Sequence, residues 1–273
     1  MGNIIRSPTW SSARVKPPFG AIRVNWRHPV TRDLIGCWLL NEAGGTTAVD
    51  LARGIHGGTL TNGAAFATRA TGRGVEFDGT NDKIELANNA VIGTAVGPLS
   101  VVARIEPDFG TTGTNRSLFY WGLDNSVGAR HFLRYESSTF GWYADGDSGN
   151  TGRTEGNLTW TVGDVFDIAH TVDTSTATGQ WYKNGVAVTT TQQSGTHSTV
   201  GTWSARIGQF LASDLRAFDG VIYHLYLFKR VVTASEVRDL WREPYAFFEP
   251  EIRRRYFVLP AVGFVPYQPW FHR

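Results

Sequence analysis

The sequence predicts an all-β fold: a two-sheet antiparallel jelly-roll sandwich with one short C-terminal helix and an extended arm at each end. In residues 165–172, Phe166, Ile168 and Val172 fall on one face of an extended chain, a period of two that indicates a strand. Asn184-Gly185 then joins two β-prone runs, and a type I′ hairpin turn favours this dipeptide because both central residues need positive φ. The 31 glycines and the aromatic content of 13% suit many turns between pleated strands, and 273 residues can bury one large core.

Residues 1–32 are expected to form an extended N-terminal arm. Four prolines each remove a backbone donor and exclude a long helix or a central strand: Pro8, Pro17, Pro18 and Pro29. The arm is too apolar for a solvated linker, because it also carries Ile4, Ile5, Trp10, Phe19, Ile22 and Trp26. We therefore expect it to bury these side chains on its own domain or on a neighbour.

The jelly-roll domain is expected over residues 33–243. A first core strand at 34–40 precedes a loop-rich stretch at 50–72 and two short strands around the turn at 78–82. Between residues 99 and 144 strands alternate with Gly- and Asn-rich turns, and their aromatic side chains are expected to fill the core. A long polar loop is expected over 145–163. Three strands within 165–188 and the runs 204–208 and 218–228 complete the sheets.

A helix is expected over residues 233–242, because Thr233 and Glu236 form a capping box and Val237, Leu240 and Trp241 share one face. Residues 244–273 then form a C-terminal arm in which five prolines exclude a regular helix. The arm carries nine aromatic residues, which is too large an apolar surface for a free tail.

Four stretches carry a family resemblance. They are Gly74–Gly79, the strand Leu99–Ile105, the hairpin around Trp181-Tyr182-Lys183-Asn184-Gly185 and the closing strand Phe218–Phe228. Together they resemble laminin G-like domains of the concanavalin A-like lectin/glucanase superfamily, in which the second stretch usually reads F-T-V-S-A-W-V. The run from His28 to Gly45, HPVTRDLIGCWLLNEAGG, resembles the start of laminin G-like proteins encoded by tailed bacteriophages. The resemblance implies a concanavalin A-like fold, which hosts lectins, hydrolases and structural modules alike.

Catalytic residues are not expected. Retaining glucanases of this superfamily carry E-x-D-x-E on one strand, with two carboxylates about 5 Å apart, and Glu76-Phe77-Asp78-Gly79-Thr80 lacks the third acid. His170 is expected to be a packed structural histidine. Asp78, Asp82, Asp145 and Asp147 are candidate calcium ligands, because Ca²⁺ takes several carboxylate oxygens, but turns use the same residues. No other cofactor is expected.

Charge is unevenly distributed along the chain. Residues 1–32 hold six basic and no acidic groups, whereas residues 33–248 have a net charge of −6, which indicates interaction tails. A single cysteine and the lack of a long apolar run favour a protein that is made in a cytoplasm and does not span a membrane. The short basic run Arg253-Arg254-Arg255 lacks a nucleic-acid reader motif, so nucleic-acid binding is not expected.

The favoured function is a non-enzymatic structural protein of a phage virion, a capsid decoration protein anchored through its arms to the major capsid protein or other virion proteins. It is expected to be oligomeric on the particle and to bind surface glycans weakly. The alternatives are a carbohydrate-binding adhesin module and, third, a glycoside hydrolase. The expected partner-binding residues are Trp10, Trp26, Phe247, Phe248, Arg253, Arg254, Arg255, Tyr256, Phe257 and Trp270. The competing arrangement has both arms folded back on their own sandwich.

Overall fold

The computed structural model describes residues 15–87, 98–111, 115–122, 130–136, 139–146, 149–173, 178–193, 204–210 and 216–251.

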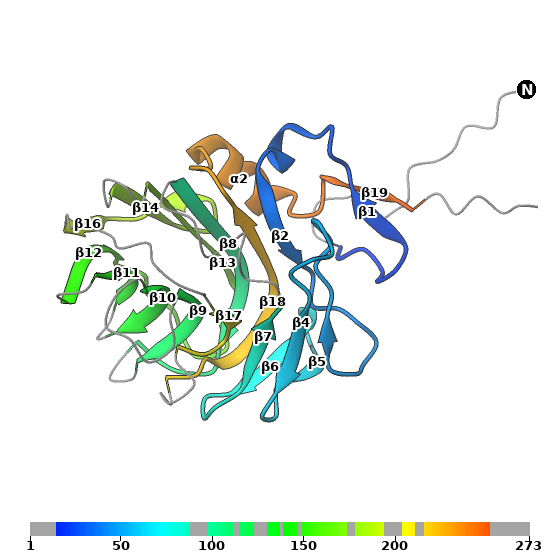
Figure 1. Cartoon of the computed structure of the whole chain (residues 1–273), viewed down its shortest axis with the longest axis horizontal. Helices are drawn as coiled ribbons and strands as arrows, with labels where there is room; N and C mark the ends of the chain where they lie inside the picture. The colour runs from blue at the N-terminus through cyan, green and yellow to red at the C-terminus, as the bar shows by residue number, and fades with distance from the viewer. Residues whose placement is uncertain are drawn as a thin grey trace, which may run out of the picture.

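Two antiparallel sheets pack face to face (Figure 1). The eight-stranded sheet has the order β15 (Val186–Ala187), β14 (Thr178–Lys183), β13 (Phe166–Asp173), β8 (Pro98–Pro107), β18 (Asp219–Phe228), β6 (Gly72–Asp78) and β5 (Ala65–Arg69), with β2 (Leu34–Trp38) also paired to β18. The nine-stranded sheet has the order β16 (Thr190–Gln193), β12 (Gly149–Gly156), β11 (Thr139–Gly146), β10 (Arg130–Glu136), β9 (Arg116–Gly122), β17 (Ser204–Ile207), β7 (Lys83–Leu86), β4 (Gly58–Thr61) and β3 (Thr47–Ala48). The expected jelly-roll sandwich is confirmed.

The main core lies between the sheets. β13 contributes Phe166, Ile168 and Val172, as its period of two predicts, and Trp121 and Phe140 face them from the other sheet. His170 on β13 is buried, and its Nε2 lies 2.7 Å from Thr154 Oγ1 on β12, which links the two sheets. Burial lowers the pKa of His170 to about 3, so the ring is neutral and structural, as the sequence predicts.

The hairpin between β14 and β15 forms as predicted. Asn184 has φ 50° and Gly185 has φ 75°, the left-handed conformations that a type I′ turn requires. Tyr182 pairs with Ala187 across this turn. The helix is also confirmed: α2 (Ala234–Arg242) begins after Thr233, whose side chain and that of Glu236 form the reciprocal capping box.

Two stretches differ from the sequence prediction. β4 and β5 lie in the stretch expected to be loop-rich, and β12 occupies half of the expected polar loop at 145–163. β12 has the sequence GNTGRTEG, which contains no apolar residue, so no alternation reveals it. Hydrogen bonds to β11 on one side and β16 on the other hold it in the sheet, which shows that pairing can override weak β propensity.

A third layer covers the outer face of the eight-stranded sheet. It comprises α2, the 3-10 helix η2 (Pro29–Thr31) and a two-stranded sheet in which β1 (Ile22–Val24) pairs with β19 (Phe248–Pro250). In Figure 1 these elements lie along β2 and β18, away from β9–β12. A second apolar cluster fills the space beneath them, with Leu34, Tyr226 and Leu240 among its members. β18 and β13 are consequently buried on both faces.

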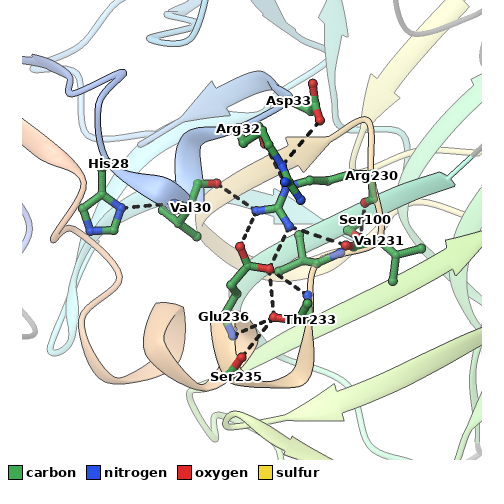
Figure 2. A network of polar contacts seen from close by, with 11 residues as sticks. His28, Val30, Arg32, Asp33, Ser100, Arg230, Val231, Thr233, Ser235 and Glu236 are labelled. Carbon is green, nitrogen blue, oxygen red and sulfur yellow. Dashed lines mark hydrogen bonds and ion pairs between the residues drawn. The ribbon is translucent and has the colours of Figure 1, made fainter.

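Arg230 joins this layer to the sandwich (Figure 2). Its guanidinium donates to the carbonyl oxygens of Val30 and Arg32 in the N-terminal arm, at 3.1 and 2.9 Å. It also binds both carboxylate oxygens of Glu236 in α2, at 2.7 and 2.8 Å. The run that begins at His28 therefore has a structural role, since it presents these carbonyls to a buried arginine.

The described parts of both arms thus pack on their own sandwich, whereas the sequence analysis favoured neighbouring subunits. Phe247 and Phe248 are 1% and 6% exposed, and both belong to the second apolar cluster. Their burial within this chain leaves no surface for the expected contact with a neighbour. The physical reason is the unpartnered outer face of the eight-stranded sheet, whose apolar side chains the arms cover.

Candidate functional site

The candidate site is a cavity of about 490 Å³ between the N-terminal arm and the outer face of the eight-stranded sheet, called the arm cavity below. It lies where the second apolar cluster ends and polar side chains begin. Its lining is Val15, Lys16, Pro17, Pro18, Phe19, Asn41, Ala70, Thr71, Gly72, Arg73, Arg104, Tyr223 and Tyr245. A concave site of this size with a few convergent polar groups is typical of small-ligand binding.

Three neighbouring strands supply the floor. Arg73 comes from β6, Arg104 from β8 and Tyr223 from β18, which runs between them. A β-bulge interrupts the pairing of β18 with β8 between Ile222 and His224. The extra residue resets the alternation, so that Tyr223 and His224 both lie on the outer face while Ile222 stays in the main core.

The arm supplies the opposite wall. Lys16 Nζ donates to the backbone oxygens of Arg73 at 2.6 Å and Tyr223 at 2.5 Å, which fastens the arm to β6 and β18. Asn41 Nδ2 donates to Pro17 O at 2.8 Å and holds the next residue of the arm. Burial lowers the pKa of Lys16 to about 7; Glu42 opposes this shift, and the positive charges of Arg104 and Arg73 add to it.

Tyr223 is held by a polar network beneath the cavity. Its hydroxyl donates to Glu106 and accepts from Thr71 Oγ1 at 2.5 Å. Burial and the hydrogen bond to Glu106 raise the pKa of Tyr223 to about 12, so the phenol stays protonated. Arg69 lies 3.8 Å from Glu106 and 3.0 Å from Asp108, so the negative charge of Glu106 is compensated.

Arg73 and Arg104 differ in how many of their donors are used. Arg73 donates to the backbone oxygens of Glu42 and Ala43 at 2.6 and 2.8 Å. Arg104 is 20% exposed, and its contact within the described residues is one long bond of 3.4 Å to Asp167. The remaining N–H groups of Arg104 are therefore available to a ligand in the cavity.

His224 lies behind Arg104 but does not add a charge. Burial, together with the charges of Lys16 and Arg104, holds the pKa of His224 well below its usual value. The 3.9 Å approach of its Nε2 to Asp167 is therefore not an ion pair. Its ring stacks on Tyr226 at 4.6 Å, and its Nδ1 lies 3.4 Å from the hydroxyl of Tyr245.

Of the expected calcium ligands, Asp78 and Asp82 lie together in the turn after β6. Asp82 Oδ2 accepts from the backbone of Asp78, and Asp78 Oδ1 accepts from the backbone of Thr80, so both carboxylates shape the turn. Burial raises the pKa of Asp82. Asp145 belongs to β11 with its side chain outside the described residues, and Asp147 lies outside them altogether. Within the described ranges no three His, Cys, Asp or Glu side chains meet as a metal site.

Of the expected partner-binding residues, the structure describes Trp26, Phe247 and Phe248, and it brings the two phenylalanines into contact, with ring centroids 4.4 Å apart. Trp26 is 53% exposed and lines a separate hollow of about 530 Å³ with Arg23 and Arg27. Phe247 and Phe248 lie in the second apolar cluster, as described above. Outside the described residues lie Trp10, Arg253, Arg254, Arg255, Tyr256, Phe257 and Trp270.

Sequence reasoning missed the residues of the arm cavity. In the sequence, Lys16 is recognised only as one of the six basic residues of the N-terminal arm, and Tyr223 only as part of a predicted strand. One signal was present: Arg104 stands where the related strand pattern F-T-V-S-A-W-V has tryptophan. β8 is largely buried, so a charged side chain on it needs polar surroundings, which Asp167 and the cavity provide.

The profile of the concanavalin A-like lectin/glucanase superfamily matches residues 78–238, more than half of the chain. The chain belongs to this superfamily. No curated protein sequence matches it significantly. Within the described part of the chain, no helix has the length and apolarity needed to cross a membrane.

Several solved structures share the superfamily fold. Domain 4 of the extracellular arabinanase AbnA from Geobacillus stearothermophilus, in complex with arabinotriose, is 19% identical, with a TM-score of 0.55 over 81% of this chain and 98% of that one. The binding domain of Paraclostridial mosquitocidal protein 1 is 14% identical, with a TM-score of 0.57 over 78% and 52%. A Trypanosoma rangeli sialidase is 18% identical, with a TM-score of 0.54 over 77% of this chain and a third, 33%, of its own length. At these identities the likeness concerns the fold alone.

Proposed function

We propose that the protein binds glycans through the arm cavity and does not cleave them. The observation that carries the proposal is the lining of the cavity, which brings hydroxyl, amide and guanidinium groups together beside exposed aromatic surface. Polyhydroxylated ligands are recognised by this combination of hydrogen-bonding groups and rings. The arabinanase domain, which spans nearly its whole length in the comparison, was solved with a trisaccharide and supports the same class of ligand.

The lack of cleavage rests on the two carboxylates that come nearest to the glucanase pattern. Glu76 pairs with Arg69 at 2.5 Å, and Asp78 caps the turn that follows β6. Each therefore has a structural partner in place of a substrate.

Affinity electrophoresis against a panel of neutral and acidic polysaccharides tests this function. We expect at least one polysaccharide to retard the protein, and a parallel assay to detect no new reducing ends. The glycan proposal fails if no polysaccharide retards the protein, and the proposal of no cleavage fails if reducing sugar is released.

We further propose that the protein acts on the particle of a tailed bacteriophage, as an oligomeric decoration protein attached to the capsid. The support is the sequence outside the described residues at each end. Residues 1–14 and 252–273 carry six basic and no acidic groups, which leaves a net charge of −4 on residues 15–251. The described chain ends beside β1, where Glu251 N donates to Ala21 O at 2.9 Å. Basic, aromatic extensions of an acidic domain suit attachment to other virion proteins.

Deletion of residues 252–273 separates attachment from folding, because it leaves β19 and its pairing with β1 intact. We expect the shortened protein to keep its unfolding temperature and glycan binding, and to lose co-sedimentation with capsids. Co-sedimentation equal to that of the full chain would overturn the attachment proposal. The matched control is the triple variant Arg253→Gln, Arg254→Gln and Arg255→Gln, which keeps the aromatic residues.

A further inference from the structure

The charge of the arm cavity is one-sided. Two arginines line it, Arg73 and Arg104, together with Lys16, whose pKa of about 7 leaves it partly protonated at neutral pH, and no acidic side chain is among its described lining residues. The nearby carboxylates lie outside the lining: Glu106 faces Tyr223 and Arg69, Asp167 contacts Arg104 at 3.4 Å, and Glu42 interacts with Lys16. Asp167 and Glu42 offset part of this positive charge, and an anionic ligand would balance the remainder.

Arg104 is the group with donors to offer. Its planar fork carries five N–H groups, and the contact to Asp167 occupies one of them. Lys16 uses two backbone oxygens as acceptors, so one of the three N–H groups of its ammonium remains. A carboxylate has two oxygens in one plane and therefore suits a guanidinium fork better than a point charge does.

An aromatic surface stands in the same cavity. Phe19 is 45% exposed and belongs to the lining, on the arm that faces Arg104 across the cavity. An exposed ring can pack against the C–H face of a pyranose and remove apolar surface from water. Thr71 and Asn41 add a hydroxyl and an amide for the sugar hydroxyls.

We propose that the arm cavity binds an acidic saccharide, whose carboxylate is held by Arg104 and Lys16 and whose ring packs on Phe19. This inference rests on the proposed glycan binding and names the class of sugar. The ligand is thus a hexuronic acid or another sugar that carries a carboxylate on its ring or side chain. A volume of about 490 Å³ accommodates one or two sugar residues.

Nuclear magnetic resonance titration of the full-length protein tests the inference, with three probes that separate charge from ring. D-Glucuronate and D-glucose share a ring and differ at C6, and acetate carries the carboxylate alone. We expect glucuronate to bind at least tenfold more tightly than either of the other two. Equal binding of glucose, or equal binding of acetate, would overturn the proposal.

Matched variants locate the site. Arg104→Gln should weaken glucuronate binding at least tenfold, and Arg53→Gln, which removes an exposed arginine outside the cavity, should leave it unchanged. Phe19→Ala should weaken binding severalfold, and Trp26→Ala, the exposed aromatic of the other hollow, should not. Equal effects of Arg104→Gln and Arg53→Gln, or wild-type affinity in Arg104→Gln, would contradict the assignment. Phe19 is exposed, so its variant keeps the test valid even if Arg104→Gln fails to fold.

The polysaccharide panel distinguishes the two failures. Retardation by neutral polysaccharides together with equal binding of glucuronate and glucose would sink the acidic-sugar inference and leave glycan binding standing. The absence of retardation by every polysaccharide would remove the function on which the inference rests.

Discussion

Arg104 lies on β8 and Arg230 follows the end of the neighbouring strand β18, and both lie next to the N-terminal arm, but their surroundings differ. The guanidinium of Arg230 makes bonds of 2.7 to 3.1 Å to one carboxylate and two backbone oxygens, and its side chain is 7% exposed. Arg104 has one contact of 3.4 Å among the described residues and is 20% exposed. We infer that an arginine whose N–H groups all have protein acceptors serves the structure, whereas one with unused N–H groups can bind a ligand. Variants of Arg230 and of Arg104 test this distinction.

Arg230→Gln should have the largest effect on stability. It leaves Glu236 and two arm carbonyls without their donor, and breaking a buried pair in this way costs about 3–4 kcal/mol. The unfolding temperature should fall by roughly 10 °C in a scanning calorimetry experiment. Arg53→Gln serves as the exposed control and should change it little. If the two variants had the same unfolding temperature, the network of Figure 2 would not stabilise the fold.

Lys16 should make stability depend on pH above neutrality. Its pKa is about 7 in the folded protein, against an ordinary value of 10.5, so between these values the unfolded chain binds more protons. Stability should therefore rise from pH 7 to pH 10.5 and fall again as pH returns to 7. The groups that face Lys16 are Arg73, Arg104, Glu42 and Tyr223, and the raised pKa of Tyr223 keeps it protonated through this range.

Urea unfolding of the wild type and of Lys16→Met at several pH values measures this effect. The variant should lose the rise, because methionine removes the charge while its unbranched side chain is only one heavy atom shorter. An identical pH profile in both proteins would show that Lys16 is not desolvated.

Arg104→Gln should affect stability much less than Arg230→Gln does. One long contact to Asp167 is lost, which costs about 1 kcal/mol. Equilibrium urea unfolding of wild type and of the two variants gives the loss in free energy of unfolding for each variant. A loss for Arg104→Gln as large as that for Arg230→Gln would make Arg104 a structural residue and remove the distinction drawn above.

Glu236→Gln should have an effect of similar size to that of Arg104→Gln, but one that depends on pH. Burial alone would raise the pKa of Glu236, but the bonds from Arg230 and Thr233 outweigh it and hold the pKa below its ordinary 4.5. The stabilisation is present above pH 4.5 and is lost as pH falls through the lower folded value. Wild type should therefore be more stable at pH 7, by about 1 kcal/mol, and the difference should shrink as pH falls below 4.5. A constant difference across this range would rule out the charge of Glu236 as the cause.

Local patterns in the sequence predicted the elements whose signal is local. The alternation around Phe166 gave β13, Asn184-Gly185 gave a hairpin, and the spacing of Thr233 and Glu236 gave the helix start. β12 could not be found in this way, because hydrogen bonds from both neighbours hold it and its own side chains show no period. The formation of such a strand is determined by the neighbouring strands and not by its own residue pattern.

The candidate site was beyond sequence reasoning for a similar reason. Arg73, Arg104 and Tyr223 are neighbours only because β6, β8 and β18 pair out of chain order. The β-bulge at Tyr223 also shifts the strand register, and no residue pattern in the sequence predicts it. The aromatic content of the C-terminal arm predicted burial, and the three aromatic residues of the arm that the structure describes, Tyr245, Phe247 and Phe248, are buried. It could not show whether Phe247 would lie on this domain or on another, since both offer apolar surface.

The pairing of β1 with β19 has a consequence for how the chain is made. Arg23 and Glu249, joined by a 2.8 Å contact, are 226 positions apart in the sequence. Contacts between residues so far apart in the sequence form slowly, because closing a long loop costs conformational entropy before any stabilising contact is made. Residue 250 must also have left the ribosome before it can reach residue 22. The outer layer should consequently close late in folding, on a sandwich that has already formed.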